Sequence, residues 1–455
     1  MLPLPARSDR SLHVGETGAL FLALSVILTG FGILMIYSAS SIVALTSQDY
    51  GFNPAYFAIR QAAYAIAGAI LAAVAWYFDY HAWSEKLLPL IWGLIVLMLG
   101  AVLLTSAGAD AYGATRWLSI GSVHLQPSEF AKPVMLLCAA RIFQMYYEEG
   151  GLTFNELGLA SFVVFGLPLF LVIRQPDKGS VLIMVVTIAV MLFLAGFPLK
   201  YTLGILAAVC GGIWALANFD SYSRARIEMM NNPWVDPYKA GYQLIQGYYA
   251  FGSGGLLGVG LGMSRQKYSY LPMAYNDFIL AVTGEELGFV GLAVLLTAFL
   301  CLVWLGLKIA REAPDMAGRL IAAGAVTMMF AQLMVNACGV VGLLPLSGKP
   351  VPFMSYGGSS IVSTLILVGL VLSVARASQE GSASRARDFS VLQGSTGTSG
   401  RGFRVISGGR SQRTPEGIRQ SHDLADRLGG RVSYNANGTR RVDLGRSPTD
   451  RLRGR

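Results

Sequence analysis

Charge is scarce in this chain, and its scarcity excludes an ordinary soluble domain. Of the 455 residues, 13% are charged and 54% are hydrophobic, whereas a typical soluble domain has about 25% charged residues. The hydrophobic residues also come in long blocks rather than scattered along the chain. Because lipid is the solvent that suits such blocks, the composition predicts an integral membrane protein.

Cysteine and histidine are also few, and their spacing excludes the usual metal sites. The four cysteines are Cys138, Cys210, Cys301 and Cys338, each inside an apolar stretch and none in a C-x-x-C pair. The four histidines are scattered without a zinc-binding spacing. We therefore expect no disulfide and no metal site. Nothing in the membrane domain indicates a nucleic-acid partner.

Ten apolar runs have about the length that a membrane-spanning helix needs, which is about 20 residues. They lie at 19–37, 62–78, 87–104, 130–145, 157–173, 179–194, 201–217, 278–305, 320–344 and 359–374. The sequence therefore predicts an all-α integral membrane protein with about ten transmembrane helices and a large extracytoplasmic loop between helices 7 and 8. No internal repeat supports a transporter built from duplicated halves.

Three regions follow from this pattern: a cytoplasmic N-terminus at 1–18, a polytopic membrane domain at 19–376 and a cytoplasmic tail at 377–455. An even number of spans places both termini on one side, and the positive-inside rule makes that side cytoplasmic. The tail contains 15 arginines, no lysine and seven acidic residues. Its low apolar content predicts mostly disorder, with 421–428 as a candidate short helix and anionic membrane lipid as its neighbour.

The predicted outer face carries basic residues against the usual bias, which an anionic ligand bound there would explain. These residues are Arg116, Arg174, Lys178, Arg224, Arg226, Lys239, Arg265, Lys267 and Lys349. The longest outer segment, 218–276, exceeds the length of a plain connector and is a functional candidate. Its stretch 252–262 is rich in glycine, which indicates close backbone approach or mobility.

Three acidic motifs are candidates for chemistry, and each also has a purely structural explanation. Glu129 and Lys132 are three residues apart and share one face of a helix, so they form either a functional pair or a structural ion pair. Asp177 lies in a Q-P-D-K-G-S turn, where turn chemistry is the alternative. Asp277 stands at the mouth of the eighth predicted helix, where helix capping is the alternative.

The last outer loop, residues 342–360, contains three prolines and four glycines. It leads into the N-terminus of the last helix, and serine hydroxyls and backbone N–H groups in that setting can bind phosphate. A tightly packed plug between helices is the alternative interpretation.

Seven short motifs follow one another along the membrane domain. They are R-W at 116–117, Q-P-S-E-x-x-K at 126–132, Q-P-D-x-G at 175–179, Y-Q-x-x-Q at 242–246, N-D-F-I at 276–279, G-E-E-L-G at 284–288 and P-F-M-S-Y-G-G-S-S at 352–360. In this order they resemble the SEDS family (shape, elongation, division and sporulation) of FtsW/RodA-type peptidoglycan polymerases. The resemblance covers residues 19 to about 376.

The chain departs from the family pattern at two places. Met273, Tyr275 and Asn276 replace the Glu, His and Thr that usually precede the eighth helix, although Asp277 is retained. Family members mostly have an apolar or aromatic residue where Lys178 stands. Any role of the usual Glu or His therefore does not carry over to this chain.

The resemblance implies an inverting glycosyltransferase that polymerises lipid II, a disaccharide-peptide on a polyprenyl pyrophosphate. The reaction would take place at the outer face of the bacterial cytoplasmic membrane. The family's essential Asp falls on Asp277, which we expect to be the catalytic base. A helix N-terminus would lower the pKa of this carboxyl group and burial would raise it, and the sequence leaves this open.

The expected substrate-binding residues come from the motifs and from the outer-face cations. They are Arg116, Glu129, Lys132, Gln175, Asp177, Arg224, Arg226, Lys239, Gln243, Gln246, Lys267, Glu286, Ser355, Gly357, Ser359 and Ser360. No cofactor is required by the sequence, although a divalent cation, magnesium or manganese, is compatible with pyrophosphate chemistry.

Within the family, the S-G-K-P-V-P-F loop and the long tail favour the division-type FtsW branch over the elongation-type RodA branch. The resemblance also implies a class B penicillin-binding protein transpeptidase as partner, together with other divisome proteins. Two rival functions remain, a lipid II flippase and a non-catalytic division scaffold.

Overall fold

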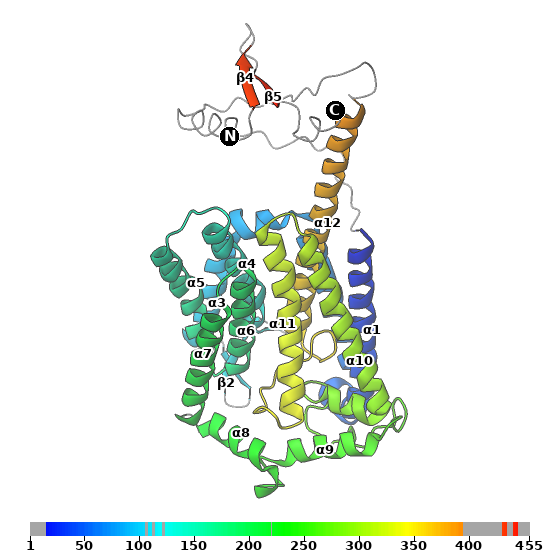
Figure 1. Ribbon diagram of the computed structural model, residues 1–455. Helices are drawn as coiled ribbons and strands as arrows, with labels where there is room; N and C mark the ends of the chain where they lie inside the picture. The colour runs from blue at the N-terminus through cyan, green and yellow to red at the C-terminus, as the bar shows by residue number, and fades with distance from the viewer. Residues whose placement is uncertain are drawn as a thin grey trace, which may run out of the picture. The chain divides into compact units, whose positions relative to one another are not determined.

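A computed structural model of the chain shows a bundle of long helices (Figure 1). The structure describes residues 15–394, apart from 105–107, 112–113, 121–122 and 220, together with 430–434 and 440–444. Two compact units are present, Met1–Phe389 and Ser390–Arg455. In the second unit, β4 (Gly430–Tyr434) and β5 (Arg440–Leu444) form a two-stranded antiparallel sheet. The helix proposed at 421–428 lies outside the described residues.

The apolar runs of the sequence are helices in the structure. These are α1 (Gly15–Thr46), α2 (Tyr56–Tyr77), α3 (Leu88–Leu104), α4 (Pro127–Tyr147), α5 (Phe154–Arg174), α6 (Lys178–Leu194), α7 (Leu199–Phe219), α10 (Ile279–Glu312), α11 (Met316–Val340) and α12 (Gly358–Gly394). Among the described residues, six helices are long and apolar enough to cross a membrane, namely α1, α2, α5, α10, α11 and the Gly358–Glu380 part of α12. The multi-pass membrane fold is confirmed, while the count of ten spans stays a prediction.

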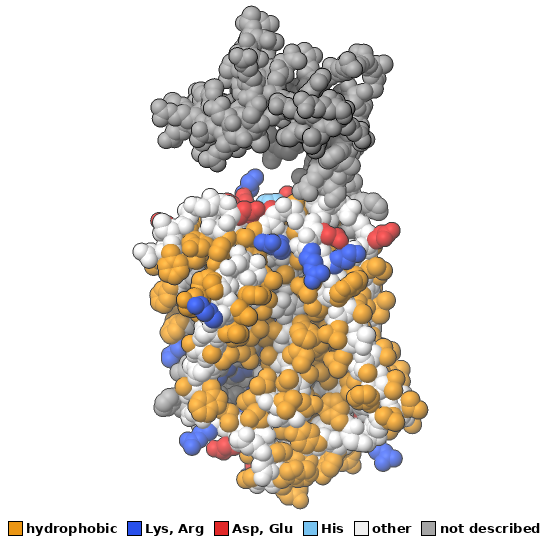
Figure 2. All heavy atoms as spheres, in the orientation of Figure 1, with side chains coloured by type: hydrophobic (Ala, Val, Ile, Leu, Met, Phe, Trp, Pro, Cys, Tyr) orange, Lys and Arg blue, Asp and Glu red, His pale blue; other side chains and the backbone are white. Residues whose placement is uncertain are grey.

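Hydrophobic side chains cover the flank of the bundle, and most charged side chains on the visible face lie toward its two ends (Figure 2). This distribution matches a protein whose flank contacts lipid and whose ends contact water. At the C-terminal side, α12 continues to Gly394. The last helix therefore extends well past Arg376, where the sequence pattern placed the start of the tail.

Helix α4, which contains the fourth apolar run, is surrounded by protein. Most of its residues are buried, and it packs against α3, α5, α6 and α11. A helix without a lipid-facing side does not need a continuous apolar surface. It can therefore contain charged residues such as Glu129 and Lys132, provided that they are paired.

The connections at one end of the bundle are themselves structured (Figure 1). Segment 218–276 contains α8 (Ser221–Asn231), the short 3₁₀ helix η3 (Pro233–Val235) and α9 (Tyr242–Gly254). A small antiparallel sheet in the order β1 (Gly108–Ala111), β2 (Ala114–Ile120), β3 (Val123–Leu125) connects α3 to α4. The all-α prediction lacked this sheet. The connection is too polar to form another span, and the backbone groups of its strands pair with one another.

Helix α10 is interrupted at Gly288, whose backbone angles are φ 67° and ψ −169°. The interruption releases the carbonyls of Glu285 and Glu286 from helical bonding. The N–H groups of Val259 and Gly260 donate to these carbonyls at 3.0 and 2.9 Å. Two further bonds run from α10 to the glycine-rich stretch. The glycines expected to permit close backbone approach therefore dock onto the broken helix and satisfy its polar groups.

Gly288→Ala is expected to destabilise the protein. A Cβ at this position would lie 2.3 Å from the backbone nitrogen of Gly258, and the backbone conformation itself costs about 1–3 kcal/mol for a residue other than glycine. Thermal unfolding of the detergent-solubilised protein measures the effect. Gly158→Ala is the matched control, because a Cβ on Gly158 in α5 meets nothing within 4 Å. Equal melting temperatures for the two variants would contradict the prediction.

Candidate functional site

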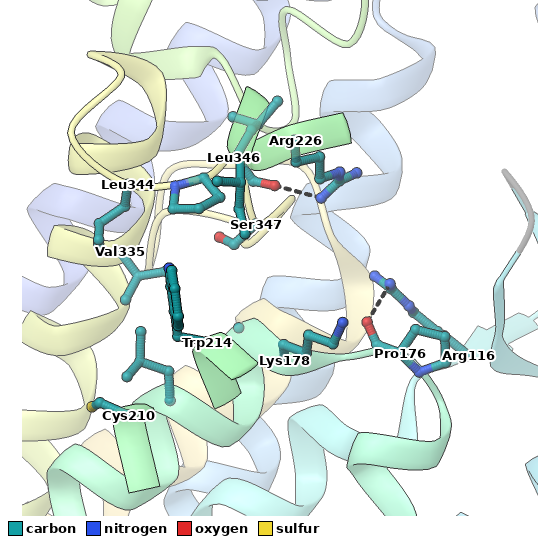
Figure 3. Close-up of a pocket in the computed structure, with 14 residues that line it drawn as sticks. Arg116, Pro176, Lys178, Cys210, Trp214, Arg226, Val335, Leu344, Leu346 and Ser347 are labelled. Atoms are coloured by element: carbon teal, nitrogen blue, oxygen red, sulfur yellow. Dashed lines mark hydrogen bonds between the residues drawn. The ribbon is translucent and has the colours of Figure 1, made fainter. Parts of the chain in front are cut away.

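A partly open cavity of about 280 Å³ lies among β2, α6, α7, α8 and the loop that follows α11. Its wall is mainly apolar and includes Leu182 and Trp214. Three cationic side chains line it, Arg116 from β2, Lys178 from α6 and Arg226 from α8 (Figure 3). The cavity therefore combines an apolar wall with positive charge, which suits a ligand that has both a lipid chain and an anionic group.

Backbone carbonyls orient the two arginines of the cavity. Arg116 donates from Nε and Nη2 to the carbonyls of Gln175 and Pro176, at 3.1 and 2.6 Å. Arg226 donates from Nη1 to the carbonyl of Leu346 (Figure 3). These bonds fix the orientation of the two guanidinium groups at the cavity.

Asp277 lies immediately before α10, and its carboxylate approaches the last loop at Gly348. A Cβ built on Gly348 would be 3.4 Å from Oδ2 of Asp277. Helix α10 has Phe278 as its N-cap residue, so helix capping does not account for Asp277. The side chain is partly exposed, as a group that must reach a substrate needs to be.

Burial raises the pKa of the Asp277 carboxyl group above its ordinary value, although the positive charges of Arg226, Lys349 and Arg116 act in the opposite direction. Burial therefore outweighs the cations. A carboxylate with a raised pKa is a stronger base. Of the two influences that the sequence named, burial acts on this carboxyl group as expected.

Two buried ion pairs lie next to one another in the core. Lys132 Nζ is 2.7 Å from Glu129 Oε2, as the sequence spacing predicted. Lys349 Nζ is 2.7 Å from Asp177 Oδ1 and donates to Ser180 Oγ at 2.9 Å. Lys349 is also 4.0 Å from Glu129 Oε1, which connects the two pairs. Four charged side chains, each at most 2% exposed, therefore form one neutral cluster.

Asp177 belongs to this buried cluster and is not among the residues that line the cavity. Burial alone would raise its pKa, but Lys349 and Arg116 hold the pKa of this carboxyl group well below its usual range. A carboxylate that is held so firmly in its charged form is a weak base. The sequence placed Lys349 among the basic residues of the outer face, but it did not predict Lys349 as a site residue or as the partner of Asp177.

The structure brings two of the predicted cations to the cavity and places the others elsewhere. Arg224 is exposed and lies 3.5 Å from Glu228 on the same helix. Lys239 is also exposed. Lys267 is buried, with Nζ 3.6 Å from Glu286. Lys178, a departure from the family pattern, lines the cavity although it was not predicted as a site residue.

Two of the three predicted glutamines, and Glu286, have structural partners. Gln175 donates to the carbonyl of Leu99 at 2.9 Å and Gln243 donates to the carbonyl of Pro272 at 2.9 Å. Gln246 is partly buried on α9. Glu286 accepts from the Ser38 hydroxyl at 2.6 and 2.8 Å, which joins α10 to α1. Substrate contacts of these residues stay a prediction.

The polar groups of the last loop also bond within the protein. The hydroxyl oxygens of the three predicted serines accept hydrogen bonds: Ser355 from the Val351 N–H, Ser359 from the Gln126 N–H and Ser360 from the Gln332 amide. The Gly357 N–H donates to the Gln61 side chain. These bonds favour the packed plug over a phosphate cradle. Phosphate binding by this loop stays a prediction.

The part of the chain that the structure describes has no group of three His, Cys, Asp or Glu side chains able to hold a metal ion. The four cysteines are free thiols. The expectation that the protein holds no metal of its own stays a prediction.

Comparison with known proteins finds relatives over most of the chain. The family model for FtsW, RodA and SpoVE, described as cell cycle protein, matches residues 19–380. A probable peptidoglycan glycosyltransferase FtsW from Geobacter metallireducens is 41% identical over 354 residues, which are 78% of this chain and 93% of that protein. Stage V sporulation protein E from Bacillus subtilis is 37% identical over 365 residues, 79% of this chain and 97% of that protein.

Solved structures with the same fold agree with the sequence relatives. A chain of a peptidoglycan synthase complex, described for its structural coordination of polymerization and crosslinking, has a TM-score of 0.62 at 26% identity, covering 79% of this chain and 98% of that chain. The rod shape determining protein RodA of Thermus thermophilus has a TM-score of 0.57 at 26% identity, covering 78% and 95%. By sequence and by fold, this chain belongs to the SEDS family of FtsW, RodA and SpoVE proteins.

Proposed function

We propose that this protein is a peptidoglycan glycosyltransferase of the division-type FtsW branch, with lipid II as donor and acceptor. The Geobacter relative is named for this activity. The observation that carries the proposal is the placement of Asp277, a partly exposed carboxylate on which the cavity cations Arg116 and Arg226 act. An inverting transfer to a sugar needs both a base for the incoming hydroxyl and cations for a pyrophosphate leaving group.

Asp277 is the base of the proposed reaction. It accepts the proton of the acceptor sugar 4-hydroxyl while that oxygen forms a bond to the anomeric carbon of the donor. The bond from this carbon to the pyrophosphate oxygen breaks, the polyprenyl pyrophosphate leaves, and the configuration inverts. A positioned general base contributes typically about 10²–10⁴-fold to the rate.

Arg116, Lys178 and Arg226 bind the donor pyrophosphate in this proposal. Charge-assisted hydrogen bonds hold the phosphate oxygens, and preorganised cations stabilise the negative charge that develops on the leaving group. The apolar wall at Leu182 and Trp214 takes the first part of the polyprenyl chain. Because the described residues do not offer a metal site, we infer that magnesium or manganese, where the reaction uses one, enters with the pyrophosphate.

We also propose the cytoplasmic membrane of a bacterium as the location, with the α8–α9 end of the bundle facing outward, where basic residues collect against the usual bias. A class B penicillin-binding protein is the proposed partner, together with other divisome proteins. The similar chain from a peptidoglycan synthase complex supports a transpeptidase partner. The Arg-rich tail would then face anionic lipid on the cytoplasmic side.

Removal of a cavity cation is expected to weaken substrate binding. Arg226→Gln should raise the KM for lipid II by roughly 10-fold or more, because a hydrogen bond to a charged group is worth about 1.5–3 kcal/mol. Arg224→Gln is the matched control, since Arg224 lies on the same helix but is exposed and paired with Glu228. Initial rates across a series of lipid II concentrations measure both. Equal KM values for the two variants would remove Arg226 from the binding site.

Reconstitution in vesicles that contain fluorescent lipid II separates the three candidate functions. A polymerase converts the lipid II on the accessible leaflet into glycan chains. A flippase moves the label to the other leaflet and forms no polymer, and a scaffold does neither. We expect polymer, and translocation without polymer would overturn the proposal in favour of a transporter.

A further inference from the structure

Asn336 of α11 contacts both the segment that contains Asp277 and the last loop. Its Nδ2 donates to the backbone carbonyl of Asp277 at 2.8 Å and to the backbone carbonyl of Lys349 at 2.7 Å. The side chain is 3% exposed. Within the described residues its Oδ1 has no hydrogen-bond partner. The amide is therefore held in place by its two donations.

A second amide lies one turn earlier on the same face of α11. Gln332 is four residues before Asn336, a spacing that places both on one side of a helix. Its Nε2 donates to the carbonyl of Pro350 at 2.8 Å and to the Ser360 hydroxyl at 3.2 Å. Together the two amides form a clamp along α11 that holds the last loop at residues 349 and 350 and the start of α12 at residue 360.

The last loop needs such a clamp because it has no regular structure of its own. No helix or strand lies between Val341 and Gly357, so its buried carbonyls require partners from elsewhere. The loop also donates from the Tyr356 N–H to the carbonyl of Tyr275 at 3.0 Å. The segment that presents Asp277 is thus joined to the last loop by this bond and to α11 by the Asn336 amide. A side-chain substitution can remove the bond from Asn336.

We propose that Asn336 is a positioning residue for glycosyl transfer, which fastens the backbone of Asp277 to the loop at Lys349 and so fixes the carboxylate relative to the cations around it. This inference rests on the proposed function. The charged groups that act on Asp277 are Arg116 on β2, Arg226 on α8 and Lys349 on the loop. Lys349 is in turn held by Asp177 and approached by Glu129.

Loss of the clamp has a consequence for pH dependence that a general loss of stability would not produce. Lys349 lowers the pKa of Asp277, so a loop that moves away from Asp277 lets this pKa rise further. The base is active when deprotonated, and activity is lost as the pH falls through its pKa. The acidic limb of the pH–rate profile should therefore move to higher pH.

Asn336→Leu tests the proposal in the purified full-length protein. We expect kcat to fall by roughly 10- to 100-fold, since a misplacement of about 1 Å can cost 10² in rate. The KM for lipid II should change little, because the cavity cations remain. Thr327→Val is the matched control on α11, where the Thr327 hydroxyl donates only to Ala323 of its own helix. It should leave kcat and the pH profile unchanged.

Asn336→Ala is the second variant, in case Asn336→Leu fails to fold; it removes the same two donations with a smaller side chain. A lower kcat with an unmoved acidic limb in the folded variant would show a merely structural role and overturn the inference. Wild-type kcat would do the same. If the wild-type protein itself forms no polymer, the proposed function has failed, which is a different result from polymerisation that is indifferent to Asn336.

Discussion

Asp277→Asn is expected to slow glycan polymerisation by about 10²-fold or more, because an amide cannot accept the proton of the incoming hydroxyl. Asparagine has nearly the same shape as aspartate, and the side chain is partly exposed, so the variant should fold and insert normally. Arg116 and Arg226 still line the cavity, so lipid II should still bind. The expected signature is a large loss of kcat with little change in KM.

The same substitution at Asp236 is a matched control for Asp277→Asn. Asp236 lies in the same outer segment and accepts a hydrogen bond only from the Ala240 N–H, at 3.4 Å. Equal amounts of the purified proteins are compared by initial rate at saturating lipid II. A wild-type rate from Asp277→Asn would exclude Asp277 as the base.

Glu129→Ala is expected to destabilise the protein by about 3–5 kcal/mol, the typical cost of leaving one buried charge without its partner. Lys132 is 2% exposed and would lose the carboxylate that lies 2.7 Å from its Nζ. Lys349 would lose a second acidic neighbour at 4.0 Å. Replacement of both Glu129 and Lys132 by methionine should cost less than the single change, because neither charge then remains unpaired.

Exchange of the two residues tests whether the pair does more than fold the protein. Glu129→Lys combined with Lys132→Glu restores a pair, but it places a lysine beside Lys349. We expect partial recovery of thermal stability without recovery of activity. Glu228→Ala is the control, since its pair with Arg224 is exposed and such pairs contribute about 0–1 kcal/mol. Equal melting temperatures for Glu129→Ala and Glu228→Ala would contradict a buried pair.

The helices were predictable because a helix that contacts lipid needs a long apolar run, and such runs are visible in the sequence. Helix α4 is the case where contact with lipid is not the reason, because protein surrounds this helix and permits Glu129 and Lys132 inside it. The interruption of α10 at Gly288 was not predictable. Its released carbonyls depend on N–H groups from the stretch 252–262, and the local sequence does not reveal this partner. The β1–β3 sheet likewise depends on pairing between short polar segments.

In the candidate site too, contacts between residues close in sequence were predictable and contacts between distant residues were not. The Glu129–Lys132 pair is three residues apart and follows from helix geometry. The contact between Lys349 and Asp177 joins residues 172 positions apart, and no spacing rule predicts it. The outer-face cations are equivalent in sequence. Only the fold places Arg226 at the cavity and leaves Arg224, two residues earlier, exposed.

Wild-type protein purified in detergent and incubated with lipid II alone provides the most direct measurement. No bilayer is then present to be crossed, and no other polymerase is present. A ladder of glycan chains on a gel is the predicted result, strengthened or unchanged when the transpeptidase partner is added. Intact lipid II recovered from folded protein, with and without that partner, would contradict glycosyl transfer by this chain.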